Sequence, residues 1–436
     1  MADTVLEITD KITDKIADKI ADKTAGKATD KMTNKTVDMT MIKTTDKASD
    51  TEFDNQLKQL NTPCYIIDEK KLKDNLTILR SVEQDTGCHI LLAQKAFSYY
   101  PAYPLIGSYI SGTTASGLYE ARLGYEEMKK KCPEAENHVF CPGFKECEMD
   151  MLDTWCDHLV FNSLSQYEKL HSLCRNASIG LRINPECSTQ EGHDIYDPCA
   201  PYSRLGITAD KLYKSYPDAL PKDVEGLHFH TLCEQNADAL FTTLQAVEEK
   251  FGRYLTQIKW LNFGGGHHIT RVDYDLALLK KSILYIQNKY DVRVYLEPGE
   301  AVALNAGYFV AEVVDIVNNG MDILILDGSA ACHMPDVLEM PYRPPLRDSG
   351  MPGEKKHTYR LACSTCLAGD VIGDYSFDRK LQIGDRLIFE DMAIYSMVKN
   401  NTFNGMPLPD IVYRKENGEM VLQKGFGYHD FKERLG

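Results

Sequence analysis

The sequence predicts an α/β protein in which a TIM-type (β/α)8 barrel is followed by a separate C-terminal β domain. Two observations predict this. Seven short apolar runs recur within residues 58–305 with helical segments between them, the pattern of parallel strands joined by helices. Across residues 306–436 the helical segments largely disappear, and strand-like runs follow one another through turns. An open doubly wound sheet is the structural alternative for the first region.

The first 57 residues differ in composition from the rest of the chain. Lysines recur at every fourth position from Lys11 to Lys35, often with an aspartate before them. A four-residue repeat drifts by about 40° per step around a helix of 3.6 residues per turn, so no apolar face persists. We expect residues 1–57 to be a solvated extension, disordered or partly helical, that takes no part in chemistry. A targeting or assembly role is the alternative.

The seven apolar runs of the first region mostly end on polar or glycine residues. They read HILLAQK, HVFCPG, HLVFNS, IGLRINP, GLHFHTL, IKWLNFGGG and VRVYLEPGE. A short strand at residues 64–67 precedes them and leads into a helix that starts near Asp68, a good N-cap. A barrel requires about 250 residues, and its reactive groups lie at the carboxyl ends of its strands. The polar ends of these runs therefore predict the functional rim.

The last region, residues 306–436, is predicted to form the β domain. Its strand-like runs are YFVAEVVDIV, MDILILDGS, HTYRLACSTC, GDRLIFEDM and DIVYRKENGEMVLQKG. Within the last run, Asn417-Gly418 separates two strand-like segments, and Asn-Gly is the strongest short-range signal for a β-hairpin. A length of about 130 residues lies within the usual range for a domain.

Composition and charge limit the classes of function. The chain of 436 residues has no apolar run near the about 20 residues of a membrane span, and its N-terminus lacks a signal-peptide core. A formal net charge of −15 argues against a nucleic-acid partner and suits a cationic substrate. Thirteen cysteines without a framework spacing predict reduced thiols in a cytoplasmic protein.

Two charged residues end apolar runs on the predicted rim. Lys95 is either a structural lysine or a Schiff-base lysine whose amine becomes nucleophilic where burial or another cation lowers its pKa. Glu297 could keep the nitrogen of a cofactor ring protonated, or it could form a salt bridge with a neighbouring arginine. Their convergence with other polar residues on one rim is the evidence for a site. Those residues are Asn162, Arg182, His228, His230 and Gly264 to Gly266.

The run NFGGGHH contains three consecutive glycines, Gly264 to Gly266. Glycines let main-chain N–H groups approach a phosphate, although such a run can equally be a turn. It is not a G-x-G-x-x-G fingerprint, so no dinucleotide is specially implied. His228 and His230 lie two residues apart on one strand face, which is also a metal-binding arrangement. His230 could instead stack on an aromatic cofactor, and either histidine could simply belong to the core.

Cys363 and Cys366 form a C-x-x-C pair, which raises zinc or redox chemistry. No second pair has matching spacing, so we predict no metal site. A single poised thiol at Cys366 that donates a proton is one alternative, and a buried inert cysteine is the other.

Several runs occur in the same order in the fold-type III pyridoxal-phosphate decarboxylases, the alanine-racemase-like group. They are LLAQKAF, GLRINP, GLHFH, NFGGGH, YLEPGEA, STCLAGD and GDRLIFEDMAIYS. Longer runs between residue 61 and the C-terminus resemble the branch of this group that decarboxylates carboxylated triamines. Those runs are GTTASGLYEARLG, YDPCAPYSRLG, HFHTLCEQN, GGGHHITR, CHMPDVLEMPYRP and TCLAGDVIGDYSF.

The resemblance implies pyridoxal 5'-phosphate as the cofactor and a role for each matching residue. Lys95 matches the lysine that holds the cofactor covalently, His230 the histidine stacked on its ring, and Glu297 the carboxylate paired with its nitrogen. Cys366 matches a cysteine that the partner subunit supplies and that returns a proton to the substrate, so a homodimer with shared active sites is implied. The residues expected at the phosphate are Gly264, Gly265, Gly266 and Tyr395.

Departures from the group's pattern imply that substrate recognition differs from that of the relatives that take ornithine. Glu300 stands where relatives that take ornithine have an arginine, and Leu367 replaces an aspartate that they use for the distal amine. Acidic side chains at Glu300, Asp336 and Glu339 would suit the ammonium groups of a carboxylated polyamine. The implied lyase reaction converts carboxynorspermidine to norspermidine and carboxyspermidine to spermidine, in polyamine biosynthesis. Alternatives are a diaminopimelate or ornithine decarboxylase, a metal-dependent barrel hydrolase, a non-catalytic cofactor carrier and a racemase.

Overall fold

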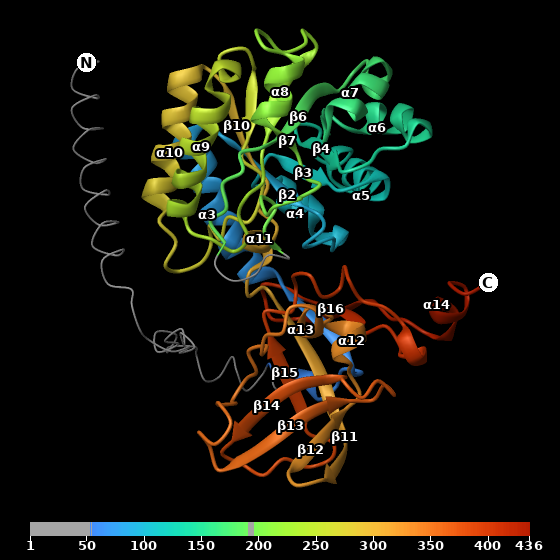
Figure 1. Ribbon diagram of the computed structural model, residues 1–436. Helices are drawn as coiled ribbons and strands as arrows, with labels where there is room; N and C mark the ends of the chain where they lie inside the picture. Colours follow the sequence, from blue (N-terminus) through green and yellow to red (C-terminus); the bar gives the residue numbers. More distant parts are fainter. Residues whose placement is uncertain (1–52, 54, 191–195) are drawn as a thin grey trace, which may run out of the picture. The chain divides into compact units, whose positions relative to one another are not determined.

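The computed structural model describes residues 53, 55–190 and 196–436 (Figure 1). The predicted N-terminal extension, residues 1–57, lies almost entirely outside the described residues. Residues 56–436 form one unit that contains two β-sheets.

The first sheet closes into a ring of eight parallel strands, in which β10 pairs with β2 and β5 pairs with β6. The eight-stranded β/α barrel is therefore confirmed. Its strands are β2 (His89–Ala93), β3 (Gly112–Ala115), β4 (Glu136–Cys141), β5 (His158–Phe161), β6 (Ser178–Asn184), β8 (Val224–His228), β9 (Trp260–Asn262) and β10 (Arg293–Leu296). The short strand β7 (Ile207–Thr208) pairs with β6 outside the ring.

Helices cover the outside of the barrel, as Figure 1 shows. They are α3 (Glu69–Thr86), α4 (Tyr103–Gly107), α5 (Leu118–Gly124), α6 (Met149–Trp155), α7 (Leu164–Leu170), α8 (Ala209–Ser215), α9 (Ala237–Leu255) and α10 (Leu276–Tyr290), while the short helix α11 (Glu300–Ala303) follows the carboxyl end of β10. The predicted cap of the first of these is present, because the Oδ1 atom of Asp68 accepts a hydrogen bond from the Lys71 N–H at 3.1 Å. No helix among the described residues is both long and apolar enough to span a membrane.

The barrel interior is packed around Trp260 on β9. Gly180 on β6 and Gly226 on β8 leave room for its indole ring, because a Cβ atom at these positions would lie 2.2 Å and 2.0 Å from ring atoms. The indole N–H donates to the Ser178 hydroxyl at 2.9 Å. The barrel is thus a filled core and not a pore, and its chemistry has to take place at a rim.

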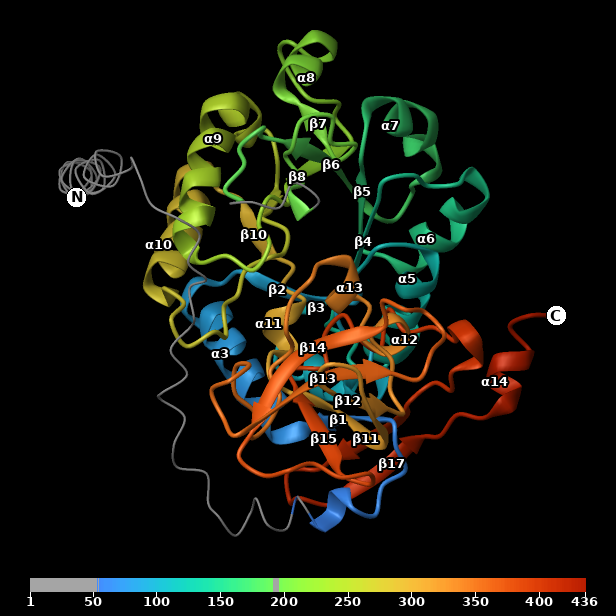
Figure 2. The same cartoon turned by 60° about the horizontal axis from the view of Figure 1, so that its bottom comes forward.

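The second sheet has the order β14-β13-β12-β11-β1-β16-β17, and β15 lies off this path and pairs with residues 308–312 of β11 (Figure 2). Its strands are β1 (Cys64–Asp68), β11 (Gly307–Asn318), β12 (Asp322–Leu326), β13 (His357–Cys363), β14 (Val371–Phe377), β15 (Arg386–Glu390), β16 (Asp410–Arg414) and β17 (Met420–Lys424). Short helices accompany it, namely α12 (Ala330–His333), α13 (Asp336–Glu339) and α14 (Tyr428–Lys432). The predicted hairpin at Asn417-Gly418 is confirmed, since β16 and β17 pair antiparallel around it.

The strand β1 differs from the sequence expectation. Its residues fall in the segment 58–305 that we assigned to the barrel, yet β1 pairs with β11 and β16 of the second sheet. The physical reason is that β1 is buried along its whole length and links the two cores. Tyr65 packs in the core of the second sheet, while Ile67, nearer the end of the strand that leads into α3, packs in the barrel core.

Candidate active site

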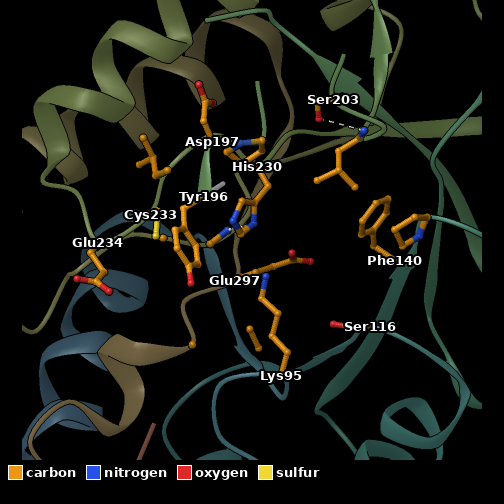
Figure 3. A pocket seen from close by; sticks show the side chains of 18 of the residues that line it. Lys95, Ser116, Phe140, Tyr196, Asp197, Ser203, His230, Cys233, Glu234 and Glu297 are labelled. Atoms are coloured by element: carbon orange, nitrogen blue, oxygen red, sulfur yellow. Dashed lines mark hydrogen bonds between the residues drawn. The ribbon is translucent and has the colours of Figure 1, made fainter. Parts of the chain in front are cut away.

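A cavity of about 710 Å³ opens at the carboxyl ends of the barrel strands (Figure 3). Loops of the barrel and loops that follow α12 and β15 both line it. The structure brings most of the predicted residues together there. The predicted residues that line the cavity are Lys95, Arg182, His228, His230, Gly265, Gly266, Glu297, Glu300, Asp336 and Tyr395.

Lys95 lies two residues beyond β2 and points toward Glu297 (Figure 3). The side chain of Lys95 is exposed to the solvent of the cavity, and the cavity walls surround its ammonium group. The partial loss of water around this ammonium, together with the positive charge of Arg182, lowers the pKa of Lys95. A lowered pKa leaves more of the amine unprotonated, which is the form that attacks a carbonyl carbon.

Glu297 follows β10 and is held by two donors. His228 Nε2 lies 3.1 Å from its Oε2 atom, and Asn262 Nδ2 donates to its Oε1 atom at 2.8 Å. Burial disfavours the charged carboxylate, but His228 and Asn262 outweigh this effect and hold the pKa of Glu297 at about 2. The side chain is therefore an ionised carboxylate that faces Lys95 across the cavity.

His230 packs against the glycine run. The Gly265 N–H donates to His230 Nδ1 at 3.1 Å, so the ring proton sits on Nε2. Burial, and secondarily the charge of Lys95, holds the pKa of His230 well below its usual value, so the ring is neutral. A flat, neutral imidazole fixed by a backbone hydrogen bond suits stacking on an aromatic ring.

The three glycines are required by the crowded backbone around them. A Cβ atom would lie 2.4 Å from a carbonyl oxygen at Gly264, 2.5 Å at Gly265 and 2.0 Å at Gly266. The Gly264 N–H donates to Asn262 at 2.8 Å, and the Gly265 N–H is used by His230. Gly264 does not line the cavity. Phosphate binding by all three glycines therefore stays a prediction, and the structure gives each glycine a steric reason of its own.

Tyr395 belongs to the loop after β15 and reaches the cavity from the second sheet. Its N–H donates to the Ala96 carbonyl at 2.9 Å, which ties this loop to the residue after Lys95. Its backbone has φ 49°, in the left-handed region. Burial raises the pKa of its phenol, which therefore stays protonated and able to donate a hydrogen bond.

The three predicted substrate carboxylates have different surroundings. Glu300 lies 3.1 Å from His268 Nε2. Asp336 contacts the Lys399 ammonium, and Glu339 lies 2.6 Å from the same ammonium without lining the cavity.

Cys366 is not brought into the cavity of its own chain. It is exposed in the loop after β13, where its N–H donates to Asn404 Oδ1 at 3.0 Å. Its C-x-x-C neighbour Cys363 is buried, and burial raises the pKa of that thiol well above its usual value. All thirteen cysteines are free thiols.

The sequence reasoning missed several residues that line the cavity. Arg182 on β6, assigned to the rim but to no role, lies 4.4 Å from the Phe140 ring centroid, and burial lowers the pKa of its guanidinium to about 10. Glu234 follows the run HTLC, and burial together with Glu300 raises its pKa to about 7. A signal for Glu234 was present, because it belongs to HFHTLCEQN, one of the runs that resemble the related group. Lys399 offered no signal of its own.

One further group of potential metal ligands lies at the opposite end of the barrel among the described residues. It contains Glu136, His138 and His158, which lie at or near the amino ends of β4 and β5. The two imidazole rings stack with centroids 3.9 Å apart and planes 20° apart. Nitrogen lone pairs lie in the ring plane, so two nearly parallel rings do not direct them at one ion. His138 Nε2 instead lies 2.8 Å from Glu136.

The fold and the cavity together define a class of protein. A lysine with a lowered pKa faces an ionised carboxylate at the carboxyl rim of a β/α barrel, beside a neutral histidine and a crowded glycine run. This is the arrangement of a barrel enzyme that works through a nucleophilic amine.

Comparison with known proteins gives the family. The sequence model of a protein family, described as "Pyridoxal-dependent decarboxylase, C-terminal sheet domain", matches residues 28–393. A carboxynorspermidine/carboxyspermidine decarboxylase from Campylobacter jejuni is 42% identical over 388 residues, which are 86% of this chain and 99% of that relative. The chain belongs to the pyridoxal-dependent decarboxylases.

Two further comparisons agree with this assignment. A carboxyaminopropylagmatine decarboxylase from a Synechocystis species is 40% identical over 87% of this chain and 97% of its own length. The crystal structure of the Campylobacter jejuni carboxynorspermidine decarboxylase complexed with norspermidine has a TM-score of 0.79 and 42% identity. It covers 86% of this chain and 100% of that chain.

Proposed function

We propose that this chain decarboxylates carboxynorspermidine to norspermidine and carboxyspermidine to spermidine. The observation that carries the proposal is the 42% identity to a relative of that name over 99% of the relative's length. Lys95 and Glu297, which line the same cavity, are the groups that would hold the cofactor for such a reaction.

The residues of the cavity fit pyridoxal 5'-phosphate. A lysine amine with a lowered pKa, an ionised carboxylate and a neutral imidazole surround one space, and a Cβ at Gly265 would come 3.1 Å from the ring of His230. When bound, pyridoxal phosphate supplies an electron sink for the electron pair that the departing carboxylate leaves behind.

Each residue then has a role that follows from its surroundings. Lys95 would hold the cofactor through its amine. Glu297, ionised by its two donors, would keep the ring nitrogen protonated. His230 would fix the plane of the ring, because its own orientation is set by the Gly265 N–H. Gly266 and the Tyr395 phenol would bind the phosphate, with the neighbouring Gly264 and Gly265 shaping the turn.

The substrate's ammonium groups would meet the acidic side of the cavity. Glu300 and Asp336 line it, and Glu339 lies behind Asp336 on α13. Carboxylates bind ammonium groups through charge-assisted hydrogen bonds. The formal net charge of −15 further favours the encounter with a cationic substrate.

We place Cys366 in the active site of a partner subunit, where its thiol returns a proton to the substrate carbon. Its exposure and its absence from the cavity of its own chain support this role, and a homodimer with shared sites follows from it. The thirteen free thiols support a reducing compartment, so we place the enzyme in the cytoplasm.

A second candidate substrate is carboxyaminopropylagmatine, which the 40% identical Synechocystis relative favours. Purified enzyme with added cofactor should be incubated with each of the three carboxylated polyamines, and the released CO₂ measured. Release from carboxynorspermidine or carboxyspermidine at the higher kcat/KM supports the proposal. Turnover of carboxyaminopropylagmatine alone, or of none of the three, contradicts it.

A further inference from the structure

Lys399 forms ion pairs with two of the three carboxylates that we expected to bind the substrate, Asp336 and Glu339. The Lys399 ammonium contacts Asp336 Oδ1 and lies 2.6 Å from Glu339 Oε2. The two carboxylates are the first and last residues of α13, so the ammonium bridges both ends of this one-turn helix. Lys399 comes from the loop after β15.

The positions of Asp336, Glu339 and Lys399 determine which charges face the cavity. Asp336 and Lys399 line the cavity, whereas Glu339 does not, and its side chain is 56% exposed. Two carboxylates and one ammonium sum to a single negative charge. The Asp336 Oδ2 atom has no hydrogen bond within the described part of the chain, so this oxygen remains for a ligand.

The chemistry of the proposed reaction makes this charge important. Decarboxylation replaces the C–CO₂⁻ bond by C–H, taking up one proton and releasing neutral CO₂. The product keeps every ammonium group of the substrate and loses its carboxylate, so it is one unit more positive. A subsite with two uncompensated carboxylates would hold this product more strongly than one with a single negative charge.

We propose that Lys399 sets the α13 subsite to one net negative charge, so that it takes a single ammonium and releases the more cationic product. The inference rests on the proposed function, because it assumes a polyamine product. Lys399 is a positioning residue in this scheme, since it acts through Asp336 and Glu339 and not on the reacting atoms.

The test measures product affinity in holoenzyme variants. Norspermidine binding is followed by calorimetry, and its inhibition constant is taken from CO₂-release assays. Lys399→Met should bind norspermidine roughly tenfold more tightly, because one positive charge next to the ligand is removed. Lys399→Arg keeps the charge and should stay close to the wild type. Glu339→Gln should weaken binding several-fold, because it changes the charge in the opposite direction.

The double variant Lys399→Met with Glu339→Gln distinguishes an effect of the net charge of the subsite from a structural role of Lys399. It restores the wild-type net charge and should return product affinity to about the wild-type value, which a merely structural role of Lys399 would not do. The inference is overturned if Lys399→Met binds norspermidine no tighter than the wild type, or if the double variant binds it less well than either single variant. Failure of the proposed function would instead appear in the wild type, as absence of CO₂ release.

Discussion

Gly265 is the position where a single added carbon should disturb both the stability of the fold and the binding of the cofactor. In Gly265→Ala the new Cβ would lie 2.5 Å from the Glu297 carbonyl oxygen and 3.1 Å from His230 Cε1. Ordinary contact begins at 3.4 Å, so the backbone at Glu297 has to move by about 0.9 Å. The Glu297 N–H donates to the Gly264 carbonyl at 2.7 Å, which resists this movement. We expect a loss of about 1–3 kcal/mol of unfolding free energy.

The assay for Gly265→Ala is urea unfolding of the apoprotein, followed by titration of the folded variant with pyridoxal phosphate. The midpoint should fall at an unchanged slope, and the cofactor affinity should fall with it, because the same shift moves Glu297 and His230. Gly143→Ala is the matched control, since a Cβ there meets no atom within 4 Å. If Gly265→Ala matches the control in both measurements, the crowding that we infer around the glycine run is refuted.

Three further predictions concern single side chains. Lys95→Ala should abolish turnover together with the visible absorption of the bound cofactor, and a variant that is active and yellow would contradict the role of Lys95. Lys95→Ala and Cys366→Ala, each inactive as a pure protein, should recover activity when mixed, whereas no recovery would contradict shared sites. Glu234 has a pKa raised to about 7 from 4.5. The fold therefore loses stability as the pH rises through that interval. Glu234→Gln should be more stable than the wild type at about pH 8, with little difference at about pH 5, in thermal unfolding.

The strands that could be predicted from the sequence are those with continuous apolar runs. All seven expected barrel runs form strands, but the eighth, β3, was missed because Gly112–Ala115 contains two threonines and a glycine. It is nevertheless buried throughout, and Thr113 is satisfied by a hydrogen bond of 2.9 Å to Asn137 Oδ1. Such partners lie on neighbouring strands, so local hydrophobicity does not reveal them.

The site residues that could be predicted from the sequence are those that lie at strand ends or in family motifs. Lys95, His230 and Glu297 follow strands β2, β8 and β10, so the barrel rule alone places them on one rim. The Lys399 contact with α13 spans 60 and 63 residues along the chain, and no local pattern signals it. The role that we propose for Cys366 lies in the site of a second chain, which the contacts of one chain do not encode.

The site needs the second sheet as well as the barrel. Lys95 belongs to the barrel, but the next residue, Ala96, is held by the Tyr395 N–H from the loop after β15. That sheet in turn contains β1, the first strand of the described residues, and Arg414 on β16 forms an ion pair of 2.7 Å with Asp68 at the end of β1. Because α3 begins directly after Asp68 and packs on the barrel, the two sheets share their first connection. The position of the lysine amine therefore depends on strands from both ends of the described chain, which explains why the sequence motifs of this family run across both sheets.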